Sequence, residues 1–91
     1  MKIHLDSPLQ AQGITIVPGD YEVHVEEADG LLLLVGETAS IKLKPIKRSS
    51  KMAVRNPSVQ MRQVANEPRY LLVVRTPPAT EWVVSLEPIK P

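Results

Sequence analysis

Two histidines are the side chains of this sequence best suited to chemistry, because each lies at strand spacing from carboxylates. His4 precedes Asp6 by two positions, and His24 lies between Glu22 and Glu26. Residues two apart share one face of a β-strand, and imidazole with carboxylate is a common ligand set for zinc and other divalent metals. The two segments would have to be neighbours for a metal to bind. We favour the simpler interpretation, that these are solvent-facing sides of amphipathic strands, and predict no metal site.

The other groups that catalysis requires are not arranged for it. Cysteine is absent, which excludes disulfides, thiolate ligands and a cysteine nucleophile. No serine lies in a G-x-S-x-G motif, and the four isolated glycines make neither a dinucleotide-binding nor a phosphate-binding loop. One tryptophan, two tyrosines and no phenylalanine leave few faces on which a cofactor could stack. We therefore expect no catalytic residues, no cofactor and no enzymatic activity.

Length and composition are those of a small globular domain. The 91 residues allow one thin core, and 43% apolar with 23% charged residues is ordinary for a folded protein. We expect a single domain over residues 1–91, with 88–91 as a disordered tail. The opening MKIHLDSP turns polar at once, and no apolar run approaches the ~18 residues of a membrane-spanning helix. These features predict a cytoplasmic protein with no membrane partner.

Apolar residues recur with a period of two along short segments, which predicts an all-β fold. Nine prolines and four glycines interrupt the chain too often for long helices. The alternation is clearest at Tyr21, Val23 and Val25 against Glu22, His24 and Glu26. We predict about seven short strands in a small meandering barrel, roll or sandwich.

Turn-forming residues predict where the strands are joined. Ala28-Asp29-Gly30 predicts a tight hairpin, because Asp-Gly is favoured in two-residue turns. Residues 47–50 predict a polar turn, and 51–55 with 59–65 predict a second hairpin around Asn56-Pro57-Ser58. The stretch 58–66 could alternatively form two turns of helix.

Some strands are apolar on both faces, which raises the question of what covers the second face. The stretch 30–36 reads GLLLLVG, residues 71–74 read LLVV, and Val83 adds to the last strand. A second subunit could cover these positions, or a segment such as 9–17 could cover them within a monomer. We favour the subunit and predict a homo-oligomer, most simply a dimer, in which one alternating set lines the core and the other contacts the partner. The candidate interface residues are Leu31, Leu32, Leu33, Leu34, Val35, Leu71, Leu72, Val73, Val74 and Val83.

Charges are segregated along the chain although the net charge is only +1. The charged residues of 20–37 are all acidic, and those of 38–66 are all basic: Lys42, Lys44, Lys47, Arg48, Lys51, Arg55 and Arg62. The two segments could face each other within one chain, meet between two copies, or bind an anion such as nucleic acid with the basic stretch 42–62. No tyrosine or tryptophan lies in that stretch, which disfavours base stacking.

The sequence thus predicts a non-enzymatic β domain that associates with protein, either with itself or as a subunit of a larger assembly. The alternative is a module for anions or nucleic acid that uses the seven basic residues of 42–62.

Overall fold

The computed structural model describes residues 1–89 and confirms the all-β class. Those residues form ten strands and no helix, arranged in two antiparallel sheets. The first sheet has the order β1-β4-β5-β6, with the bounds Lys2–Leu5, Gly19–Glu26, Leu31–Val35 and Ser40–Leu43. The second has the order β3-β2-β10-β9-β8, with the bounds Ile14–Ile16, Leu9–Ala11, Thr80–Pro88, Tyr70–Thr76 and Ser58–Gln63.

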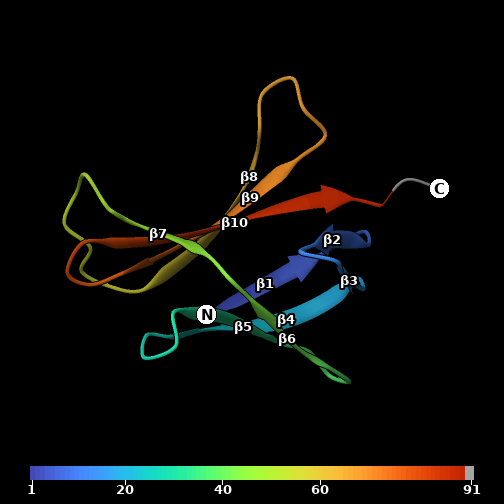
Figure 1. Cartoon of the computed structure of the whole chain (residues 1–91), viewed down its shortest axis with the longest axis horizontal. Coiled ribbons are helices and arrows are strands. Elements are labelled where there is room, and N and C mark those ends of the chain that lie inside the picture. The colour runs from blue at the N-terminus through green and yellow to red at the C-terminus, as the bar shows by residue number, and fades with distance from the viewer. Residues whose placement is uncertain (90–91) are drawn as a thin grey trace.

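The sheets face each other as two layers (Figure 1), and their inner faces form the core. Leu32 and Leu34 of the first sheet are fully buried, as are Leu72 and Val74 of the second. The one tryptophan, Trp82, is 1% exposed, and its indole Nε1 donates a hydrogen bond to Thr76 Oγ1 at 3.0 Å. Alternation therefore places one apolar set of each strand in the core, as a sandwich requires.

The strand β10 is the central strand of the second sheet. It pairs with β9 over seven residues on one side. On its other side, β7 (Ile46–Ser49) pairs with residues 80–83 and β2 pairs with residues 87 and 88. The chain reaches β7 directly from β6, so a continuous segment leaves the first sheet and enters the second around Pro45.

The glycines that flank 31–35 are required for different reasons. Gly30 ends the β4–β5 turn with φ of +67°, a left-handed conformation that glycine adopts without steric cost. At Gly36 a Cβ atom would lie 2.8 Å from Cε1 of Tyr21, a contact that could not be accommodated without movement. Tyr21 is itself buried, and its hydroxyl donates to the Val17 carbonyl at 2.6 Å. The apolar stretch 31–35 is thus bounded by a turn at Gly30 and by the close packing of Gly36 against Tyr21.

Several local predictions are wrong in detail. The β4–β5 connection has four residues, 27–30, because Glu26 pairs with Leu31. Residues 46–49 form strand β7 because β10 offers an open edge, whereas 51–55 form no strand. Residues 58–63 pair with β9, so the helical alternative for 58–66 is not adopted. Pro88 ends β10, and the Ile89 amide donates to Pro8 O at 3.5 Å; residues 90 and 91 of the expected tail lie outside the described residues.

Candidate interaction surfaces

The first histidine forms a small ionic cluster at the edge of the first sheet. The register places His4 of β1 opposite Asp20 of β4. His4 Nδ1 lies 2.7 Å from Asp20 Oδ1, and its Nε2 lies 3.0 Å from Asp6 Oδ1. The hydrogen bond with Asp20 raises the pKa of His4 above its ordinary value. His24 lies further along β4, opposite Leu33, and within residues 1–89 no three His, Cys, Asp or Glu side chains are grouped to hold a metal.

The stretch 31–35 divides into a core set and an outer set. Leu32 and Leu34 are fully buried, so they cannot contact a partner. Leu31, Leu33 and Val35 point to the opposite, outer face of the first sheet, where they are half-buried. We call these three residues the apolar stripe. β5 is an inner strand of its sheet, so the stripe runs along the middle of the outer face.

Opposite charges lie on the two sides of the apolar stripe. On β4, Glu22, His24 and Glu26 are the direct cross-strand neighbours of Val35, Leu33 and Leu31. On β6, Lys42 is the neighbour of Leu33 on the other side. Because β5 separates them, β4 and β6 lie about 10 Å apart, and among the described residues no ion pair joins the acids of β4 to Lys42. The acids and bases that are separated along the sequence are therefore also separated across the outer face of the first sheet.

The other two strands with apolar residues on both faces, β9 and β10, place their outer residues on the opposite side of the molecule. Leu72 and Val74 are buried in the core, whereas Leu71, Val73 and Val83 belong to the outer face of the second sheet. Val73 and Val83 are nevertheless 2% and 8% exposed. The sequence-predicted interface residues are therefore distributed over the core and two opposite outer faces, and they cannot form one continuous contact surface.

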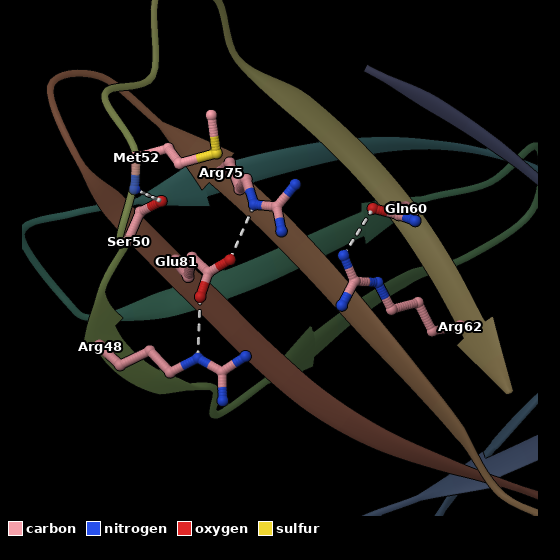
Figure 2. A network of polar contacts seen from close by, with 7 residues as sticks. All are labelled: Arg48, Ser50, Met52, Gln60, Arg62, Arg75 and Glu81. Atoms are coloured by element: carbon pink, nitrogen blue, oxygen red, sulfur yellow. Dashed lines mark hydrogen bonds and ion pairs between the residues drawn. The ribbon is translucent and has the colours of Figure 1, made fainter. Parts of the chain in front are cut away.

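A buried glutamate organises the outer face of the second sheet. Glu81 of β10 is 8% exposed and lies between Arg48 of β7 and Arg75 of β9, its cross-strand neighbours. Its Oε1 accepts a hydrogen bond from Arg48 Nε at 2.9 Å, and its Oε2 accepts one from Arg75 Nε at 2.7 Å (Figure 2). The bond from Arg75 and then that from Arg48 hold the pKa of Glu81 below its ordinary value, so the carboxylate stays ionised at neutral pH.

These arginines line a pocket of about 670 Å³ together with the β7–β8 loop. The loop is attached to the β9–β10 turn, because Ser50 N donates to Ala79 O and Val54 N donates to Pro78 O. Five basic side chains line the pocket, which we call the arginine pocket: Arg48, Lys51, Arg55, Arg62 and Arg75.

The structure thus brings together only four of the seven bases of 42–62. Lys42 lies on the outer face of the first sheet, on the far side of the molecule. Lys47 points the other way along β7, and its Nζ lies 5.1 Å from the centre of the Trp82 ring. Lys44 lies at the passage between the sheets, where its backbone bonds to Gln12.

Sequence reasoning missed Arg75 and Glu81, because neither lies within the acidic or the basic segment. The signal that could have found them is the register of the last hairpin. Thr76 pairs with Thr80, so the residues directly before and after them, Arg75 and Glu81, must be opposite and on the same face.

Comparison of the chain with protein-family models, curated proteins and solved structures finds no match. Among residues 1–89, no helix is long and apolar enough to cross a membrane.

Proposed function

We propose that this protein is a non-enzymatic association domain that binds a second copy of itself through the outer face of its first sheet. The observation that supports the proposal is the apolar stripe, which lies between an acidic strand and a lysine on one sheet face. A partner that covers the stripe must be apolar in the middle and must carry opposite charges at its two sides. The same face of another copy satisfies both requirements.

Burial of the apolar stripe supplies the attraction. Leu31, Leu33 and Val35 are only half-buried in the monomer. Completely burying a leucine or valine side chain is worth about 1.5–3 kcal/mol relative to full exposure. Half-buried residues retain a fraction of that value, and a two-fold dimer buries the stripe of both copies. The total is a few kcal/mol before the cost of association is subtracted.

Charge determines how two copies face each other. A two-fold axis parallel to β5 places β4 of each copy against β6 of the other, so that Lys42 lies over the row Glu22, His24 and Glu26. An axis across the strands would instead place the two acidic β4 strands together, which is repulsive. Only the first arrangement pairs opposite charges, and symmetry makes each pair occur twice.

We expect the proposed dimer to be weak. Four strands spaced about 4.8 Å apart and five residues of about 3.3 Å each give a flat contact of roughly 300 Å². A stable interface buries about 800 Å² of accessible surface per partner. We therefore expect a dissociation constant nearer to millimolar than to micromolar, with a dimer that forms at high protein concentration or within a larger assembly.

A charge exchange tests the arrangement. Glu26→Lys and Lys42→Glu each place like charges together twice, whereas the double variant restores opposite charges and keeps the net charge of the wild type. We expect each single variant to weaken dimerisation roughly three- to tenfold, since an exposed pair contributes about 0.2–1 kcal/mol, and the double variant to recover the wild-type constant. Sedimentation equilibrium measures the dissociation constant of the dimer for each variant.

Glu87→Lys is the matched control, because Glu87 is an exposed acid of β10 on the second sheet. It should leave dimerisation unchanged. A double variant that dimerises no better than either single variant would show that these faces do not meet in the proposed way.

A further inference from the structure

We propose that the arginine pocket binds a compact ligand that carries several linked phosphate groups. This site lies on the outer face of the second sheet, opposite the proposed dimer face, so it is a second binding function and does not depend on the first. Four observations support it: the orientation of two arginines, the local charge, the size of the pocket and the side chains that line it.

Glu81 holds two guanidinium groups in fixed positions and leaves their binding edges free. It accepts hydrogen bonds from Arg48 and Arg75 through Nε only. A guanidinium has five N–H donors, so four remain on the two terminal nitrogens of each arginine. Within residues 1–89 these terminal nitrogens make no hydrogen bond. Such an edge can bind two phosphate oxygens at once.

The charge at the pocket is much larger than that of the whole protein. Arg48, Lys51, Arg55, Arg62 and Arg75 contribute five positive charges, and Glu81 contributes one negative charge, which leaves +4 against +1 for the chain. Arg62 also lies on this face, where its terminal nitrogen donates to Gln60 Oε1 at a long 3.4 Å. A single phosphate carries at most about two charges at neutral pH, so a ligand with several phosphates matches the site better.

The pocket has the size of a small-molecule site and no aromatic wall. Its volume of about 670 Å³ lies within the ~300–1,000 Å³ of typical ligand pockets. Serines 49, 50 and 58 line it and can donate to phosphate oxygens, but no tyrosine or tryptophan does. Trp82 lies on the inner face of the same sheet, in the core. Single-stranded nucleic acid is usually held by aromatic stacking, so the lining favours recognition of phosphate without a base.

Calorimetric titration with inorganic tripolyphosphate at low salt tests the proposal. The informative variant is Arg55→Ala with Arg62→Ala, because Glu81 holds neither residue and the fold should persist. The matched control is Lys2→Ala with Lys44→Ala, which removes the same charge at exposed positions outside the pocket and outside the proposed dimer contacts; Lys44 bonds to Gln12 through its backbone only. We expect binding to the wild type, roughly tenfold or greater weakening in the pocket variant, and less than about twofold weakening in the control.

Two further ligands make the result decisive. Inorganic phosphate should bind at least about tenfold more weakly than tripolyphosphate, and a single-stranded oligonucleotide should bind no better than tripolyphosphate. Absence of tripolyphosphate binding would overturn the proposal. So would equal weakening in the two double variants, equal affinity for inorganic phosphate, or tighter binding of the oligonucleotide than of tripolyphosphate. Sedimentation of the same samples reports dimerisation separately, so failure of one proposal is distinguishable from failure of the other.

Discussion

The side chain of Gln12 pairs with the backbone of Lys44 as a neighbouring strand would. Gln12 Nε2 donates to Lys44 O at 2.7 Å, and Lys44 N donates to Gln12 Oε1 at 2.9 Å. Lys44 lies where the chain passes from β6 to β7, and Gln12 lies in the β2–β3 turn with φ of +52°. One side chain therefore holds one of the three places at which the chain passes between the two sheets, and it does so from a backbone conformation that costs energy.

Loss of this bridge should destabilise the fold moderately. Gln12→Ala removes both hydrogen bonds and keeps the unfavourable φ, so we expect about 1–2 kcal/mol of lost stability. Gln12→Gly removes the same bonds but adopts a positive φ without strain, and it should cost less. Urea denaturation compares them. If alanine and glycine variants are both as stable as the wild type, the bridge does not hold the connection.

The two faces of β5 should respond differently to truncation. Leu34 is fully buried, so Leu34→Ala should cost about 2–5 kcal/mol through lost burial and the cavity left behind. Leu33 is half-buried on the outer face, so Leu33→Ala should cost about 1 kcal/mol or less in the monomer. Thermal or urea denaturation at low protein concentration measures both. If Leu33→Ala cost more stability than Leu34→Ala, Leu33 and not Leu34 would face the core.

The ionised state of Glu81 should matter for stability and for its pH dependence. Its folded pKa lies below the ordinary 4.5, so its contribution is fully present above pH 4.5 and is lost as the pH falls through the folded value. Glu81→Gln should therefore be less stable than the wild type at pH 7, and the difference should shrink in acid. Glu87→Gln, at an exposed position of the same strand, is the control. A difference that stays constant down to pH 3 would contradict this role.

His4 should stabilise the edge of the first sheet in the opposite pH direction. The hydrogen bond with Asp20 raises its pKa above the ordinary 6.5, so its contribution is present below pH 6.5 and is lost as the pH rises through the higher folded value. Asp20→Asn should lower the pKa of His4 and remove this dependence. Titration of the imidazole by NMR measures it, with the wild type as reference. An unchanged His4 titration in Asp20→Asn would show that the partner is another group.

The strands were predictable where alternation was strong. Residues 21–26 lie within β4, and residues 81–87 lie within β10, because their apolar sides match one buried face. β7 was missed because Lys47, Arg48 and Ser49 are all exposed and carry no alternation. That strand forms because β10 presents an edge whose backbone groups it can pair with. This pairing depends on tertiary structure, so the local sequence pattern does not predict it.

The candidate sites depended on register, which the sequence alone left open. Five successive apolar residues indicated that β5 needed cover on both faces, but not which side would meet the core. Similarly, the charge segments showed that acids and bases were separated, yet only the order β4-β5-β6 places leucines between them. The arginine pocket required Arg75 and Glu81 to become neighbours across a hairpin, which follows from pairing rather than from composition.

The most direct test of self-association is the molecular mass in solution of two matched variants. Leu33 and Leu71 are both half-buried leucines, on the outer faces of the first and second sheets respectively. Light scattering over micromolar to millimolar concentrations should show a reversible dimer for the wild type and for Leu71→Gln, and a folded monomer for Leu33→Gln. A wild type that stays monomeric throughout, or a Leu33→Gln variant that dimerises as the wild type does, would contradict the proposed interface.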